Sequence, residues 1–165
     1  MPHASLASSF GMLTVFEEDG GLGAVEWGRA QDGEFTPLLS EAVQQLEAYF
    51  DGRLRRFSLP LRPPGSAFRQ RVWSRLCHIP YGKAETYGAL ALQLGTSPRA
   101  LAQACGANPL PIIIPCHRVV AARGRLGGYS GGDGRDAKLA LLRLEGALLP
   151  LHSEATISLA KHEPA

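Results

Sequence analysis

The sequence predicts a mixed α/β protein of the α+β type, in which a small β-sheet lobe with one helix precedes a mostly helical domain. Three observations predict this class. Two short apolar runs flank an acidic, glycine-bearing turn near the N-terminus. In the second half, capping residues precede several segments of helical apolar spacing. One β-branched run there, Ile112–Ile114, predicts a short strand at the candidate active site.

The N-terminal lobe is predicted to begin with a β-hairpin, formed by Leu13–Phe16 and Leu22–Trp27. A helix should follow over 36–50, because Thr36 is a good N-cap, a proline comes next, and apolar residues recur at helical spacing. Phe57–Leu59 is a candidate for one more strand.

A proline- and glycine-rich linker, Arg62–Gly65, separates two regions of opposite charge. Residues 1–61 carry a net charge of −5 and residues 62–145 a net charge of +8. The basic half suggests an anionic partner, nucleic acid first, although a solvated basic surface gives the same count. We expect a lobe at 1–64, a DNA-binding and catalytic domain at 65–150 and a flexible tail at 151–165.

Two short helices are predicted after Thr86 and after Ser97, with a glycine-bearing turn between them. This spacing matches a helix-turn-helix, and an ordinary α-hairpin is the alternative. The second helix offers Arg99 and Gln103 but otherwise small residues. Major-groove reading normally needs several long polar side chains, so this helix is better suited to close approach in the minor groove.

The reactive candidate is Cys116, at the end of the run PIIIPCHRVV. In a straight strand Cys116 and His117 would point to opposite faces, so either the chain turns there or a water joins them. A buried cysteine beside a structural histidine is the plain alternative. Zinc binding with Cys77-His78 is disfavoured, because adjacent Cys-His pairs do not have zinc-site spacing. The glycine-rich stretch 124–134 is not a dinucleotide-binding motif.

The chain-wide composition excludes other classes. No apolar run is long enough for a membrane helix, and no secretory signal is visible. Three cysteines without a C-x-x-C motif argue against a disulfide scaffold and favour a reducing compartment.

Several motifs together resemble the O6-alkylguanine-DNA alkyltransferases, also called methylated-DNA–protein-cysteine methyltransferases. The resemblance is specific from Phe68 to Gly146 and looser over 11–61. The matching pieces, in order, are Phe68–Trp73, Ile79–Gly82, Thr86-Tyr87, Arg99-Ala100, Asn108-Pro109, Pro115–Val119, Gly128–Gly132 and Leu144–Gly146. The resemblance implies a ribonuclease-H-like first lobe and a helix-turn-helix in the second.

The resemblance also implies roles for individual residues. Cys116 would accept the alkyl group, His117 would deprotonate it through a water, and Glu145 would orient the imidazole. Tyr87 would bond the flipped guanine and help to protonate it. Arg99 would enter the base stack, and Asn108 would be a hinge. The remaining expected positions are Ala100, Gln103, Thr86 and Ser97 for DNA binding, and Val119, Tyr129, Ser130 and Pro111 for the substrate pocket.

The implied function is direct reversal of DNA damage, with irreversible transfer of one alkyl group per molecule from flipped O6-alkylguanine in double-stranded DNA. The resemblance implies an enzyme without cofactor or metal, acting as a monomer in the cytoplasm, or in the nucleus of a eukaryote. Activity on O4-alkylthymine and cooperative binding to DNA stay open. Leu101 and Gln103 depart from the small residues usual in relatives.

Three other functions fit the sequence less well. A non-catalytic protein that flags alkylated bases usually carries tryptophan where this chain has Cys116. A helix-turn-helix regulator would not explain the Pro115–Val119 motif. A cysteine hydrolase needs an oxyanion site that the neighbouring motifs do not suggest.

Overall fold

The computed structural model describes residues 1–31, 33–129, 134–150 and 156–158. The chain divides into two compact units. The first contains Met1–Gly65 together with Pro109–Ile113, and the second contains Ser66–Asn108 and the chain from Ile114 onward. Among the described residues, no helix is both long and apolar enough to cross a bilayer.

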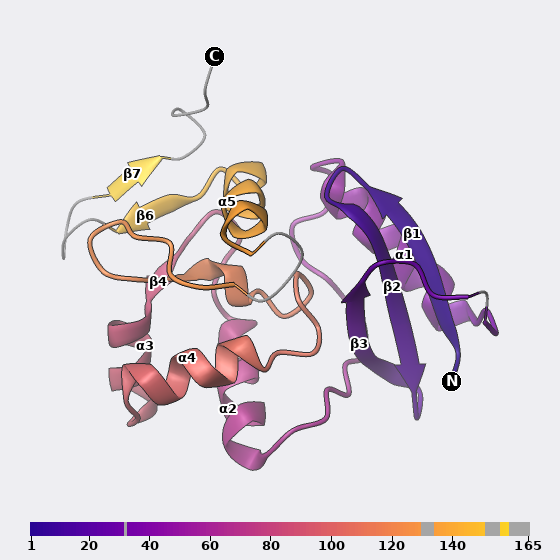
Figure 1. Cartoon of the computed structure of the whole chain (residues 1–165), viewed down its shortest axis with the longest axis horizontal. Coiled ribbons are helices and arrows are strands. Elements are labelled where there is room, and N and C mark those ends of the chain that lie inside the picture. Colours follow the sequence, from indigo (N-terminus) through magenta and orange to yellow (C-terminus); the bar gives the residue numbers. More distant parts are fainter. Residues whose placement is uncertain (32, 130–133, 151–155, 159–165) are drawn as a thin grey trace. The chain divides into compact units, whose positions relative to one another are not determined.

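The first unit is a three-stranded antiparallel sheet with helix α1 packed on β1 and β2 (Figure 1). Its elements are β1 (His3–Ser8), β2 (Gly11–Glu18), β3 (Gly21–Trp27) and α1 (Pro37–Phe50). The predicted hairpin is confirmed as β2–β3. Its two-residue loop, Asp19-Gly20, has positive φ at both positions, which suits the right-handed twist of paired strands. The first strand, β1, was not predicted.

The strand predicted at Phe57–Leu59 is wrong, because the side chain of Gln45 occupies the backbone of Ser58. Oε1 of Gln45 accepts from Ser58 N at 3.0 Å, and Nε2 lies 3.5 Å from Ser58 O. Leu61 instead forms an isolated parallel bridge with Leu22.

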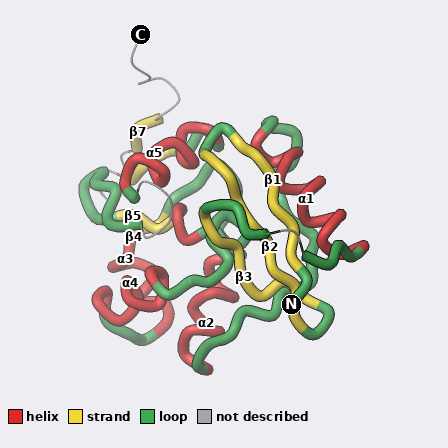
Figure 2. The backbone as a smooth tube through the Cα atoms, turned by 45° about the vertical axis from the view of Figure 1, so that its right-hand side comes forward, coloured by secondary structure: helices red, strands yellow, loops and turns green. Residues whose placement is uncertain are grey.

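The second unit is mostly helical, and Figure 2 shows its helices and short strands in red and yellow. Its elements are α2 (Ala67–Leu76), β4 (Glu85–Thr86), α3 (Tyr87–Leu94), α4 (Pro98–Gly106), the 3₁₀ helix η1 (Cys116–Arg118), β5 (Val119–Val120), α5 (Arg135–Leu144), β6 (Leu148–Pro150) and β7 (Thr156–Ser158). Strand β4 pairs with β5 in parallel. Strand β7 pairs with β6 and lies within the stretch expected to be a flexible tail.

The predicted helix-turn-helix is present as α3 and α4. Gly95, in the left-handed conformation, ends α3, and the Ser97 side chain caps α4. Helix α4 also packs on α2, where Trp73 donates from Nε1 to the carbonyl of Ala104 at 2.8 Å. This buried bond fixes the C-terminal turn of α4 within the second unit.

The strand predicted at Ile112–Ile114 is also wrong. Ile112 has φ of +76°, a left-handed conformation that β-branched residues rarely adopt and that no strand contains. The backbone then tightens into η1, so Cys116 lies on a turn and the short strand β5 comes after it. Of the two alternatives that the sequence left open for Cys116 and His117, the turn is the one observed.

Candidate active site

Cys116 is buried and lies in the wall of a cavity of about 300 Å³ within the second unit. The other lining residues come from α3, from α4 and from the segment before α5. They are Tyr87, Ala102, Cys105, Gly106, Gly128 and Tyr129. The volume is at the lower end of the range for small-molecule sites, and it places a thiol beside aromatic side chains.

The environment of Cys116 pulls its pKa in two directions. Burial raises the pKa of the thiol, whereas a hydrogen bond from Asn108 and the charge of Lys138 lower it. The amide of Asn108 also donates to the carbonyl of Ile114 at 2.9 Å, so one side chain bridges both ends of the turn before Cys116. The resting group is a thiol that needs a base.

His117 is fully buried and bonds from Nε2 to Oε2 of Glu145 at 2.8 Å. Burial lowers the pKa of the imidazole, so the ring is neutral. An ionised carboxylate can only accept, so the single ring proton is on Nε2 and Nδ1 keeps its lone pair. Among the described residues, His117 Nδ1 has no hydrogen-bond partner. His117 is therefore prepared to accept a proton.

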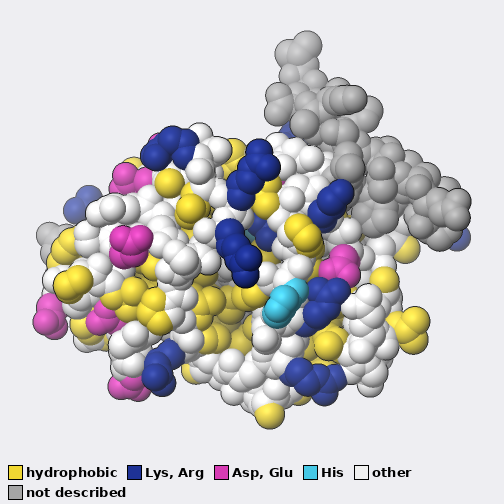
Figure 3. All heavy atoms as spheres, turned by 180° about the vertical axis from the view of Figure 1, so that it is seen from behind, with side chains coloured by type: hydrophobic (Ala, Val, Ile, Leu, Met, Phe, Trp, Pro, Cys, Tyr) yellow, Lys and Arg dark blue, Asp and Glu magenta, His cyan; other side chains and the backbone are white. Residues whose placement is uncertain are grey.

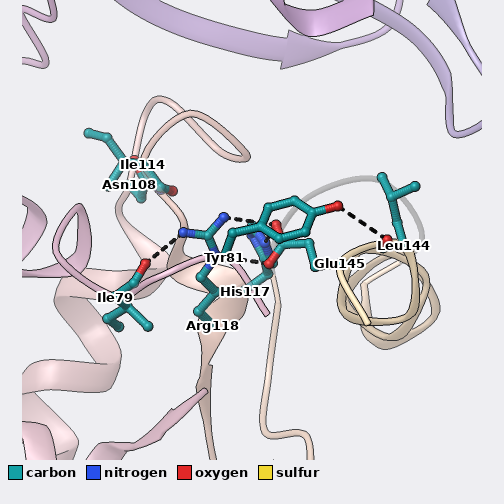
Figure 4. A network of polar contacts seen from close by, with 8 residues as sticks. All are labelled: Ile79, Tyr81, Asn108, Ile114, His117, Arg118, Leu144 and Glu145. Carbon is teal, nitrogen blue, oxygen red and sulfur yellow. Dashed lines mark hydrogen bonds and ion pairs between the residues drawn. The ribbon is translucent and has the colours of Figure 1, made fainter. Parts of the chain in front are cut away.

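Arg118 holds the carboxylate of Glu145 from the other side (Figure 4). Its Nε donates to Oε1 at 2.8 Å and its Nη2 to Oε2 at 3.0 Å, while Nη1 donates to the carbonyl of Ile79 at 2.7 Å. Burial alone would raise the pKa of Glu145, but the bonds from His117 and Arg118 lower it to about 2. Glu145 thus stays ionised inside the protein.

A second buried cation, Lys138, bonds to two residues of the cavity wall. Its Nζ donates to the carbonyls of Val119 and Gly128 at 2.6 and 3.1 Å, and to Oη of Tyr87 at 3.3 Å. Burial lowers the pKa of this lysine to about 8. One ammonium therefore links strand β5, the cavity wall and the tyrosine hydroxyl.

Two tyrosines face the cavity as neutral phenols. Burial raises the pKa of both Tyr87 and Tyr129. Because Lys138 donates to Oη of Tyr87, the phenolic proton of Tyr87 must point elsewhere. Tyr129 Oη, also buried, has no hydrogen-bond partner among the residues that the structure describes.

The residues predicted to bind DNA divide into two kinds. Thr86 and Ser97 accept from the backbone NH groups of Ala89 and Ala100, so their hydroxyls cap α3 and α4. Arg99 and Gln103 are exposed on α4, and Ala100 is half-buried there.

The predicted pocket residues are dispersed. Tyr129 lines the cavity, and Val119, fully buried, contributes a carbonyl to Lys138. Pro111 belongs to the first unit and is not among the lining residues. Ser130 lies outside the described residues.

Sequence reasoning missed Arg118, Lys138 and Cys105. A signal for Lys138 was available, because it occupies the buried stripe of α5 with Leu141 and Leu142, where a charge needs a partner. Cys105 lies on the buried side of α4, and burial raises its pKa to about 12. Arg118 lies within the Pro115–Val119 motif, but nothing near it in sequence indicates its buried ion pair with Glu145.

Family models account for both units. A model described as "6-O-methylguanine DNA methyltransferase, ribonuclease-like domain" matches residues 1–63. A model described as "6-O-methylguanine DNA methyltransferase, DNA binding domain" matches residues 67–147. The chain belongs to the 6-O-methylguanine DNA methyltransferase family. The fold class expected from the sequence is thereby confirmed, including the ribonuclease-like first lobe.

Individual relatives agree with the family models. The methylated-DNA–protein-cysteine methyltransferase of Mycobacterium tuberculosis (strain ATCC 25618 / H37Rv) is 50% identical over 113 residues, which are 67% of each chain. The protein of the same name from Methanosarcina acetivorans is 48% identical over 109 residues, 65% of this chain and 69% of that one.

Solved structures of the Mycobacterium tuberculosis protein are also similar to this chain. The crystal structure of that protein, OGT, in complex with DNA has a TM-score of 0.76 at 40% identity and covers 88% of this chain and 93% of that chain. The crystal structure of Mycobacterium tuberculosis O6-methylguanine methyltransferase has a TM-score of 0.75 at 38% identity and covers 98% of this chain and 99% of that chain.

Proposed function

We propose that this protein repairs DNA by moving an alkyl group from O6 of guanine onto Cys116. The observation that carries the proposal is the placement of the Cys116 thiol in the cavity wall, next in sequence to a neutral, carboxylate-held imidazole. Membership of the family supports the same chemistry.

The first step is removal of the thiol proton. Nδ1 of His117 accepts it through a bridging water, and the imidazolium that forms is stabilised by Glu145 at 2.8 Å. Lys138 and Asn108 favour the thiolate electrostatically. Loss of this proton converts the buried thiol into the thiolate, which is the nucleophile.

The second step is a single displacement. The thiolate forms a carbon–sulfur bond to the alkyl carbon, and the carbon–oxygen bond to O6 breaks. The electron pair passes to the guanine, which takes up a proton as it leaves as an ordinary base. Tyr87 supplies that proton, because Lys138 already occupies the acceptor side of its hydroxyl. The product thioether has no good leaving group, so each molecule reacts once.

Access to a base in duplex DNA requires that it leave the helix. Helix α4 exposes Ala102 and Gly106 beside the cavity, and such small residues let its backbone approach a narrow groove. Arg99 at the start of α4 would fill the gap in the stack. On the face shown in Figure 3, Lys and Arg side chains are interspersed with hydrophobic, acidic and uncharged groups. A protein with this function acts in the compartment that contains the DNA, which is the cytoplasm or, in a eukaryote, the nucleus.

Intact-mass analysis after incubation with duplex DNA carrying O6-methylguanine tests the proposal. One methyl group should be found on the peptide that contains Cys116, and Cys116→Ser should bind the same duplex without gaining mass. Cys77→Ser is the control, since Cys77 is exposed and lies outside the cavity. Methyl on Cys77 or Cys105, or repeated turnover, would contradict the proposal. Binding without any transfer would favour a lesion-flagging protein.

A further inference from the structure

Helix α4 presents one face to solvent. Arg99, Ala102, Gln103 and Gly106 are all exposed, at the i, i+3, i+4 and i+7 positions of a helix. Leu101, Ala104 and Cys105 are buried on the opposite side. The two departures from the pattern of relatives therefore differ in kind: Leu101 packs into the core, whereas Gln103 stands on the exposed face.

The side chain of Gln103 is free to bond a partner. Its backbone carbonyl accepts from the NH of Ala107, but its side-chain amide forms no hydrogen bond within the described part of the chain. The other members of the exposed face are a cation, a methyl group and a glycine. Gln103 is thus the one neutral side chain on this face that can both donate and accept.

Gln103 lies beside the base pocket but does not line it. Ala102, Cys105 and Gly106 of α4 line the cavity, and successive helix residues are rotated by about 100°. Gln103 shares the exposed face with Ala102 and Gly106 and lies about one turn from Arg99. This position suits contact with stacked bases beside the gap.

We propose that Gln103 reads the minor-groove edge of a base pair next to the lesion and favours a G·C pair there. The proposal rests on the proposed function, in which α4 lies in the minor groove. Guanine N2 is the one donor that a G·C pair adds in this groove, beside acceptors common to all pairs. The amide of Gln103 accepts from N2 through Oε1 and donates to a neighbouring acceptor through Nε2. Repair is therefore sequence-dependent.

The test compares single-turnover repair of duplexes that differ only in the pair on either side of O6-methylguanine. Replacing G·C by inosine·C removes the N2 amino group from the minor groove. Replacing A·T by 2,6-diaminopurine·T adds this group. Neither replacement changes the major-groove edge of the pair. The wild type should repair G·C and diaminopurine·T contexts about three- to tenfold faster than inosine·C and A·T contexts, the worth of one hydrogen bond. Gln103→Ala should remove these differences.

Controls separate the possible failures. Gln44→Ala removes an exposed amide from α1 in the first unit and should keep the wild-type preference. Reaction of Gln103→Ala with free O6-benzylguanine should stay at the wild-type rate, because no duplex is involved. If Gln103→Ala slowed repair equally in every sequence context, Gln103 would contact the DNA backbone and not a base. Equal repair rates of the wild type in every context would also contradict the proposal. Absence of transfer by the wild type would instead refute the proposed function.

Discussion

The imidazole of His117 and the carboxylate of Glu145 form a buried pair, 2.8 Å apart and fully enclosed at the side chains. Its consequence is a fixed tautomer, with the proton on Nε2 and the lone pair on Nδ1. The tautomer decides whether Cys116 has a base.

Glu145→Gln should slow alkyl transfer by at least about tenfold, because an amide can donate to Nε2 and move the ring proton to Nδ1. The measurement is the single-turnover rate with O6-methylguanine duplex across pH. Glu85→Gln, which breaks a half-buried pair with Arg75 in the same unit, is the matched control and should leave the rate near that of the wild type. A rate unchanged in Glu145→Gln would show that the imidazole is not the base.

The stability of the protein should fall in acid through the same carboxylate. The pKa of Glu145 is about 2 in the fold against an ordinary value of 4.5, so its contribution is complete above 4.5 and is lost as pH falls towards 2. The contribution is about 3 kcal/mol of unfolding free energy. Urea denaturation at several pH values should show this slope in the wild type and a weaker one in Glu145→Gln. Parallel slopes would contradict the assignment.

Lys138→Met should raise the pKa of Cys116, because a cation whose charge favours the thiolate is removed. Alkylation of Cys116 by iodoacetamide, followed by mass spectrometry, should then shift to higher pH. Repair of duplex should also slow, since Tyr87 loses the bond that directs its proton. Lys83→Met, at an exposed lysine, serves for comparison. Coincident pH profiles for Lys138→Met and the wild type would refute the electrostatic role.

Arg99→Ala should slow repair of duplex far more than reaction with free O6-benzylguanine, because only the duplex needs its gap filled. Both rates come from intact-mass time courses. Arg53→Ala, an exposed arginine of the first unit, controls for loss of positive charge. Equal losses with both substrates would exclude a role in base extrusion.

Local chemistry made much of the fold predictable. The predicted caps Thr36, Thr86 and Ser97 each accept from the backbone NH three residues on, as their positions before apolar periodic segments indicate. These bonds involve only near neighbours in sequence. The residue at which each of these helices begins follows from them.

The features that were missed depend on distant partners. Ile112 adopts a left-handed conformation that its own type disfavours, so only the surrounding fold can impose it. The buried position of Arg118 depends on hydrogen bonds to Glu145 and Ile79, which are 27 and 39 residues away in sequence. The motif indicated Cys116 and His117, but the residues that tune them come from the folded packing.

Gly127→Ala should reduce alkyl transfer through a clash with Tyr87. A Cβ at this glycine would lie 2.8 Å from Cε2 of Tyr87, and the φ of +75° is one that alanine rarely adopts. Tyr87 would have to move from the cavity wall and from Lys138. The rate with O6-methylguanine duplex should fall together with the unfolding free energy. Gly88→Ala, in α3 with open space around it, should instead raise that free energy by up to about 1 kcal/mol. A wild-type transfer rate in Gly127→Ala would mean that the position of Tyr87 does not limit the reaction.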